Sequence, residues 1–341
     1  MPYFSIIIPA YNVQDYIGEC LNSILNQTFD DYEIIIIDDS SVDRTYEIAL
    51  KYSQENACIK LKRIEHVVVG EVRNEAIKCA RGKYIVFIDA DDYIEKDMLG
   101  KIHECLLGKD TEMCFLPNHF VDYVEGKKEH SLIPNLQDEN IIFDSRNEFF
   151  RYVVEKKGVV PASMWTGVCL KSLIDENNIS MDTNYIWSQD SDFMYNVLKC
   201  SNKIAICGYR GYVWNRKNTE SATRNVSAEK IISRLSVYKK WYEAYDTGNF
   251  GDVSNEDKEY LKKTLLKNYC GVLYEFIFMK NGEQRNLVQK KLESDGLWKS
   301  EKELVPSELV KYGLSVGRWI FLFKHYSRKV KGLVIPSREY K

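Results

Sequence analysis

The sequence lacks the patterns that mark several common classes of protein. Its nine cysteines include no Cys-x-x-Cys pair, which argues against a zinc site. The odd number of cysteines argues against a disulfide framework and favours a reducing cytoplasm. A formal net charge of -3 gives no overall attraction to nucleic acid. No apolar run reaches the length of a membrane span, and the first residues lack the basic segment of a signal peptide.

Two nucleotide-binding motifs are also missing. A dinucleotide oxidoreductase would carry G-x-G-x-x-G after its first strand, and a P-loop enzyme would carry G-x-x-x-x-G-K-[ST]. The first apolar run of this chain ends instead in Pro9-Ala10-Tyr11-Asn12, which contains no glycine. A sugar-nucleotide pyrophosphorylase also has a glycine-rich first loop, so that class is kept only as a distant alternative.

Apolar runs and helical patterns alternate through the first part of the chain. With 45% hydrophobic and 28% charged residues in a chain of 341, we expect a packed core of one large domain or two. The predicted strands are Phe4–Pro9, Glu33–Ile37, Ile59–Ile64 and Tyr84–Ile88, and helices are predicted after Asn12 (as the cap), over Asp43–Gln54 and over Gly70–Ala80. This order predicts a parallel, doubly wound sheet, which binds ligands beyond the carboxyl ends of its strands.

Beyond residue 110 the alternation loosens, and near residue 225 the composition changes. The expected elements are a hairpin from Met113–Tyr123 and Glu129–Ile133, helices at Ser145–Lys157 and Gln189–Cys200, a strand at Lys203–Trp214, and long helices at Ala228–Tyr245, Asn255–Lys280 and Glu283–Glu293. We therefore predict a domain boundary near residue 225.

The segment Tyr312–Val334 combines aromatic, aliphatic and basic residues. This mixture suits a helix that lies in a membrane interface. A final amphipathic helix that packs on the domain explains it equally well, so both interpretations stay open.

Carboxylates follow two of the predicted strands. Asp38-Asp39 ends one strand, and Asp89-Ala90-Asp91-Asp92 ends another. In an extended segment Asp89 and Asp91 point to the same side. Clustered carboxylates repel one another, and hard oxygen ligands select Mg2+ or Mn2+, so the cluster favours a metal site. The alternative is a solvated loop that caps the next helix.

Four segments resemble the family 2 glycosyltransferases of GT-A fold. They are Ser5–Asn12 (SIIIPAYN), Ile37–Asp43 (IDDSSVD), Arg73-Asn74, and Gly82–Asp92 (GKYIVFIDADD). The segments occur in the family's order and at its spacing, over roughly the first hundred residues. The resemblance implies a Rossmann-like, mostly parallel central sheet flanked by helices, here followed by a C-terminal helical extension.

The resemblance also implies roles in binding a nucleotide sugar. Pro9, Ala10 and Tyr11 would contact the nucleotide, and Asp39 would bind its base, usually uracil. Arg73 would lie near the nucleotide or its phosphates, and Asp89 would face the ribose or the donor sugar. Asp91, with Asp92, would hold Mn2+ or Mg2+ on the diphosphate, as in the family's D-x-D motif.

A later segment, Trp187–Phe193 (WSQDSDF), resembles the family's Glu-Asp-x-x-Phe. Asp190 falls on the general base, which takes the proton of the acceptor hydroxyl. Gln189 replaces the usual Glu and removes one negative charge. Asp192 is the second candidate for the base, and the alternative role of Asp190 is to cap the helix that follows.

Two flanking residues extend the expected site. Trp165 lies in a stretch that resembles the acceptor side of the family, although a core tryptophan explains it equally well. Arg216 lies in a stretch that resembles a loop over the donor and would pair with the diphosphate, or it is a solvated loop charge.

The resemblance implies a metal-dependent, inverting glycosyltransferase of the hexosyltransferase type. It would move a sugar from a UDP-sugar to a saccharide or lipid-linked saccharide in assembly of a bacterial surface polysaccharide. Residues 1–225 would be the catalytic domain, with a nucleotide-binding half (1–110) and an acceptor half (111–225), and 226–341 the helical region. We expect a cytoplasmic protein, peripheral at the inner face of the membrane if the tail binds there. A homodimer through the helical region, and a non-catalytic nucleotide-sugar binder suggested by Gln189, stay open.

Overall fold

The computed structural model describes residues 1–116, 118–122, 128–132, 139–218, 227–248, 250, 253–279, 281–296 and 314. The chain divides into two compact units, one of residues 1–225 with 248–257 and one of residues 226–247 with 258–341. The short segment 248–257 thus belongs with the first unit, beyond the predicted boundary. The predicted tail Tyr312–Val334 lies outside the described residues apart from Leu314.

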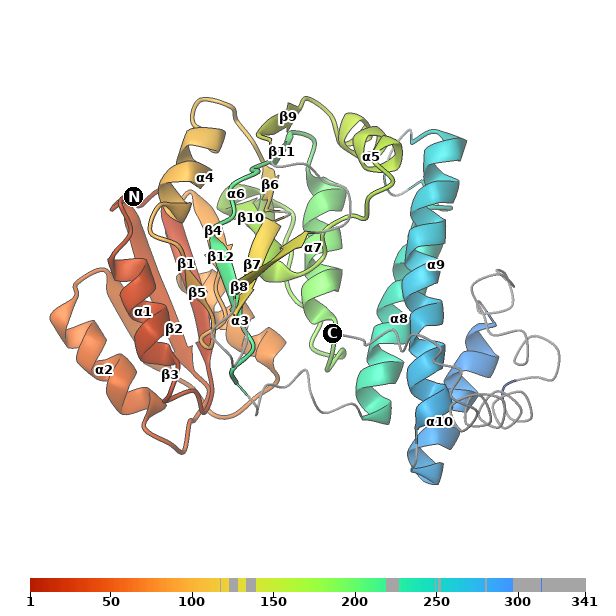
Figure 1. The fold of residues 1–341 in the computed structure, drawn as a ribbon, viewed down its shortest axis with the longest axis horizontal. Helices are drawn as coiled ribbons and strands as arrows, with labels where there is room; N and C mark the ends of the chain where they lie inside the picture. Colours follow the sequence, from red (N-terminus) through yellow and green to blue (C-terminus); the bar gives the residue numbers. More distant parts are fainter. Residues whose placement is uncertain are drawn as a thin grey trace. The chain divides into compact units, whose positions relative to one another are not determined.

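The first unit is built on an eight-stranded sheet (Figure 1). Its strands, in spatial order, are β3 (Ile59–Arg63), β2 (Tyr32–Asp38), β1 (Phe4–Ala10), β4 (Tyr84–Phe87), β10 (Gly167–Leu170), β6 (Met113–Phe115), β11 (Ile204–Ile206) and β9 (Ile141–Phe143). The first four are mutually parallel, while β10 runs against both of its neighbours and β9 runs against β11. The predicted α/β fold with a mostly parallel sheet is confirmed.

The apolar runs explain the central strands. In β1 and β2 almost every residue is buried, and the register pairs Ile6 with Ile34 and Ile8 with Ile36. Strands that are covered on both faces need such continuous apolar runs. The flanking helices of this half are α1 (Ile17–Leu25), α2 (Thr45–Glu55), α3 (Val69–Cys79) and α4 (Met98–Leu106). Helix α3 packs against β1 and β2, and this placement matters for the site.

The predicted capping role of Asn12 is wrong. Helix α1 begins at Ile17, and Asn12 lies in a turn with a left-handed φ of 50°. Its backbone N–H donates to Ser41 Oγ, and its side-chain oxygen accepts from the N–H of Val42. Asn12 therefore links the loop after β1 to the loop after β2 by hydrogen bonds. The chain turns here at the sheet edge before helix α1 starts.

A second, four-stranded sheet was not predicted. Its order is β5 (Tyr93–Ile94), β12 (Tyr212–Asn215), β7 (Asn118–Asp122) and β8 (Lys128–Leu132). The hairpin prediction is confirmed for β7 and β8, but β6 belongs to the large sheet. The single strand predicted over Lys203–Trp214 is two strands in two sheets. Between them, Gly211 lies so close to helix α4 that an added Cβ would be 2.6 Å from the side chain of Met98.

The remaining helices of the first unit are α5 (Arg146–Glu155), the short 3-10 turn Met164–Thr166, α6 (Lys171–Glu176) and α7 (Gln189–Cys200). The second unit contains α8 (Ala228–Ala244), α10 (Gly282–Asp295) and most of α9 (Asn255–Phe278), whose first turn groups with the first unit. These helices share a core that includes Leu235, Phe276 and Val288. Among the described residues, no helix is both long enough and apolar enough to cross a membrane.

Candidate functional site

The acidic cluster lies in a turn. Strand β4 ends at Phe87, and the N–H of Asp92 donates to the carbonyl of Asp89 over 3.0 Å. The prediction that this segment is extended is therefore wrong. The turn sends its three carboxylates to different partners.

Asp92 is the buried member of the cluster, with 3% of its surface exposed. Tyr212 donates its hydroxyl proton to Asp92 Oδ2 over 2.5 Å, and the N–H of Asn215 donates to Oδ1 over 2.8 Å. The pKa of Asp92 is raised well above its usual value by burial and by the charges of Asp89 and Asp91. Both oxygens of Asp92 thus accept hydrogen bonds from residues of β12 and link this strand to the turn.

Asp91 is half-buried and more accessible than Asp92. Its Oδ2 accepts a hydrogen bond from Asn218 Nδ2 over 2.8 Å. Burial and the charge of Asp89 raise the pKa of Asp91, and a bound cation would remove this cost. Within the described part of the chain, no three His, Cys, Asp or Glu side chains form a complete metal cage. One or two carboxylates fit Mg2+ or Mn2+ only when substrate oxygens complete the shell, and the predicted diphosphate would supply them.

Asp89 faces helix α3. Its Oδ1 is 2.8 Å from Arg73 Nη2, and the side chain of Arg73 is only 12% exposed. The Arg73 charge also acts on Asp190: burial raises the pKa of Asp190, Arg73 lowers it, and Asp89 raises it, with a net rise. Arg73 thus pairs directly with Asp89, and the charges of both residues act on Asp190, which lies about a hundred residues further along the chain.

Asp190 lies in the first turn of α7 and is half-buried. The N-cap of this helix is Ser188, so Asp190 does not hold the capping position that the alternative interpretation required. Gln189 is buried and donates its side-chain N–H to the carbonyl of Tyr185, which turns it into the protein. Asp192 is 1% exposed and accepts from Asn196, so Asp190 is the more accessible of the two candidate bases.

The predicted base-binding end also contains His66, which no motif in the sequence marks. Asp39 Oδ1 accepts from the N–H of Val67 over 2.8 Å, and Oδ2 lies 2.8 Å from His66 Nδ1. The imidazole of His66 is stacked on the ring of Tyr11, with 4.6 Å between centroids. His66 therefore contacts Asp39 and Tyr11, two of the residues that the resemblance assigns to the nucleotide. Pro9 and Ala10, also expected there, form the end of β1.

The two flanking candidates contact rings of the chain itself. Trp165 is stacked on Tyr212 with 4.8 Å between centroids, and it packs against the core. The guanidinium of Arg216 lies over the ring of Trp214 at 4.9 Å. Trp165 therefore packs on Tyr212, the tyrosine whose hydroxyl donates to Asp92.

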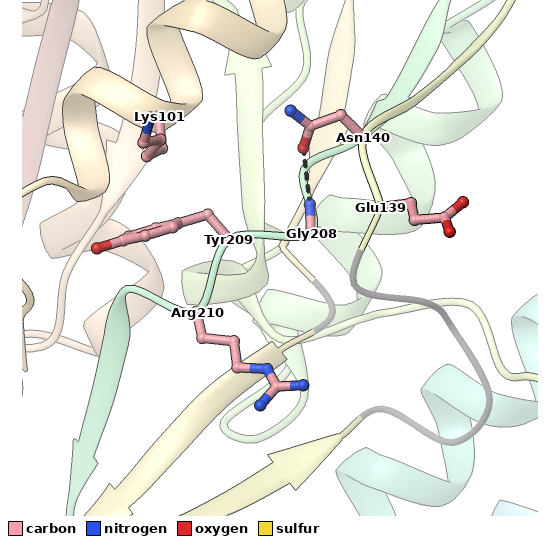
Figure 2. A pocket seen from close by; sticks show the side chains of 6 residues that line it. All are labelled: Lys101, Glu139, Asn140, Gly208, Tyr209 and Arg210. Atoms are coloured by element: carbon pink, nitrogen blue, oxygen red, sulfur yellow. Dashed lines mark hydrogen bonds between the residues drawn. The ribbon is translucent and has the colours of Figure 1, made fainter.

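A separate pocket of about 520 Å³ contains none of the predicted site residues. Figure 2 shows the hydrogen bond from the N–H of Gly208 to Asn140 Oδ1 at its wall, 3.1 Å long. The lining residues are Lys101, Glu139, Asn140, Gly208, Tyr209 and Arg210. The pocket lies where the chain passes from β11 towards β12, before the residues that contact the acidic turn.

Comparison with known proteins gives consistent matches. EpsJ of Bacillus subtilis (strain 168), an uncharacterized glycosyltransferase, is 28% identical over 225 residues, which are 65% of this chain and 63% of that protein. The poly(ribitol-phosphate) beta-N-acetylglucosaminyltransferase TarS of Staphylococcus aureus (strain Mu50) is 40% identical over 251 residues, 70% of this chain and 40% of TarS. The chain thus spans less than two thirds of the length of these relatives.

A solved structure has the same fold. The crystal structure of S. aureus TarS 1-349 in complex with UDP-GlcNAc superposes with a TM-score of 0.68 at 20% identity, covering 96% of this chain and 92% of that one. The family model described as glycosyl transferase family 2 matches residues 5–166. The matched region contains the loop after β1, both acidic strand ends and Arg73. Over residues 5–166 this chain is therefore similar to glycosyl transferase family 2.

Proposed function

We propose that this chain is a metal-dependent, inverting glycosyltransferase that uses a UDP-sugar as donor. The observation that carries the proposal is the convergence of Asp89, Arg73 and Asp190. Arg73 pairs with Asp89, and the charges of both act on Asp190. In the proposal these residues serve the donor and the base at the carboxyl edge of the sheet, where α/β folds bind ligands. TarS, whose fold is similar, is the protein that was crystallised with UDP-GlcNAc.

In the proposed reaction, Asp190 accepts the proton of the acceptor hydroxyl while that oxygen bonds to the anomeric carbon. The bond from this carbon to the diphosphate oxygen breaks, and the nucleoside diphosphate leaves with the electron pair. Attack from the opposite side inverts the configuration. The protein's main task is to hold the three groups in line.

The donor would be held by both acidic strand ends. Tyr11 and Asp39 would take the base, with His66 beside them. Arg73 and Asp89 would face the ribose, sugar or phosphates. Asp91 would hold Mn2+ or Mg2+, which neutralises charge on the leaving diphosphate when bound.

A non-catalytic nucleotide-sugar binder is the main alternative. It is suggested by Gln189, which stands in place of the family's Glu, but Gln189 is buried and its side chain donates to the carbonyl of Tyr185. The substitution therefore does not by itself remove catalysis. A sugar-nucleotide pyrophosphorylase stays the distant alternative.

The donor class can be tested by thermal unfolding. With Mn2+ present, UDP-sugars at about 100 times their Kd should raise the unfolding free energy by about 2.7 kcal/mol. GDP-sugars should give smaller shifts, because the proposal assigns uracil as the base that Tyr11 and Asp39 bind. A larger shift with GDP-sugars than with any UDP-sugar would overturn the assignment of the base.

We also propose that the acceptor is a saccharide or lipid-linked saccharide of a bacterial surface polysaccharide. TarS and the matched glycosyltransferases GlyA and TuaG come from bacteria, and TuaG is named for putative teichuronic acid biosynthesis. The aromatic and basic Tyr312–Val334 supports attachment to the membrane surface.

The membrane proposal is tested by sedimentation with phosphatidylglycerol vesicles. The full chain should sediment with them, and removal of residues 312–341 should release it. Equal recovery of both proteins in the supernatant would contradict the proposal.

A further inference from the structure

The segment between α6 and α7 leads directly to the base candidate Asp190 and has no regular secondary structure of its own. Residues 177–188 form turns and bends, and α7 starts directly afterwards at Gln189. A catalytic side chain at the end of such a segment needs fixed anchor points, because small displacements are costly for an in-line reaction. The question is which residues hold this segment in place.

Asn74 of helix α3 forms two hydrogen bonds with the backbone of Met181, within the segment. Its Nδ2 donates to the carbonyl of Met181 over 3.0 Å, and its Oδ1 accepts from the N–H of Met181 over 2.8 Å. One side-chain amide thus satisfies both backbone polar groups of a residue that is only 2% exposed. Such paired bonds fix both distance and orientation, and loss of either would leave a buried backbone group without its partner.

The same helix also lies close to Gln189, the first residue of α7. A Cβ on Gly70 would lie 2.8 Å from Gln189 Oε1 and 3.4 Å from the Cβ of Met181. The absence of a side chain at Gly70 lets α3 and the segment approach this closely. Helix α3 therefore approaches both Met181, within the segment, and Gln189, which directly precedes Asp190.

The residue before Asn74 on α3 belongs to the proposed donor site. Arg73, adjacent to Asn74, pairs with Asp89 over 2.8 Å. One helix thus carries the cation of the donor site and the anchor of the base segment on neighbouring residues.

We propose that Asn74 is a positioning residue that holds the base-bearing segment Met181–Asp190 in register with the donor site. This inference rests on the proposed function, because it assumes that Asp190 is the base. Asn74 does not touch the reacting atoms, and it acts through the backbone of Met181.

The test compares Asn74→Ala with Asn56→Ala, a matched control. Asn56, the C-cap of α2, also donates a side-chain hydrogen bond to a backbone carbonyl, that of Tyr52, over 2.9 Å. The assay measures UDP release from whichever UDP-sugar gives the highest rate with wild-type protein and Mn2+. Asn74→Ala should lower kcat by about 10- to 100-fold with less than about a threefold change in donor KM. Asn56→Ala should leave both constants unchanged.

Hydrogen exchange gives a second readout that needs no turnover. The amide of Met181 should lose protection in Asn74→Ala and keep it in Asn56→Ala. An unchanged Met181 amide, or a kcat of Asn74→Ala within twofold of the control, would overturn the positioning role.

Asp190→Asn is measured alongside to separate the two proposals. If Asp190→Asn keeps wild-type turnover, the assignment of the base fails and the positioning role with it. If Asp190→Asn is inactive while Asn74→Ala turns over normally, only the role of Asn74 fails.

Discussion

Asp190→Asn is expected to lower kcat for UDP release by about 10²- to 10⁴-fold, the range for loss of a general base. Asn has nearly the same shape as Asp, so α7 should keep its position, but an amide cannot accept the proton. Donor affinity should change little, because Asp190 is assigned to the acceptor side. Steady-state kinetics and donor titration of the variant measure both effects.

The pH profile adds an independent check. Burial raises the pKa of Asp190, and the opposing charge of Arg73 does not fully reverse this. A base works deprotonated, so kcat/KM should fall as the pH drops through this raised pKa, above the usual range of aspartate. Asp190→Asn should remove that acidic limb.

Asp192→Asn is the matched control for Asp190→Asn. Asp192 lies two residues further along α7, is almost fully buried and accepts a hydrogen bond from Asn196. It should keep turnover within a few-fold of wild type. If Asp192→Asn loses activity and Asp190→Asn does not, the base is Asp192.

Asp91→Asn is expected to remove most of the metal-dependent activity, by about 10²-fold or more, comparable with the loss of one electrostatic contact to a developing charge. The amide oxygen of the variant can still accept from Asn218, so the turn should fold as before. The stabilisation by Mn2+ with UDP should fall strongly in thermal unfolding. Turnover at a series of Mn2+ concentrations measures the loss.

The control for Asp91→Asn is Asp110→Asn. Asp110 is exposed and has a left-handed φ of 49°, which Asn tolerates well. It should retain wild-type turnover and the same Mn2+ dependence. Wild-type behaviour of Asp91→Asn in both assays would contradict the metal assignment.

The large sheet could be predicted because its evidence is local. Continuous apolar runs such as Phe4–Pro9 mark doubly covered strands, and the carboxyl ends of parallel strands necessarily share an edge. That rule places Asp39 and the acidic cluster on one side of the molecule before any coordinates are known. The resemblance then selects Asp190, and the structure brings it near Arg73.

The parts that could not be predicted depend on contacts across long stretches of chain. Asp91 and Asp92 look alike in sequence, and only Tyr212 and Asn215, in a strand of the unforeseen second sheet, distinguish them. His66 lies outside every motif and is found only through its contacts with Asp39 and Tyr11. Asn74 lies in one of the four segments that resemble the family, but its partner Met181 lies far along the chain.

The most direct test of the central claim is UDP release from a panel of UDP-sugars, with Mn2+ or Mg2+ and then with excess EDTA. We predict that at least one UDP-sugar releases UDP above the protein-free rate, that EDTA abolishes this release, and that added metal restores it. Absence of release from every UDP-sugar with either metal, or full activity in EDTA, would contradict the account.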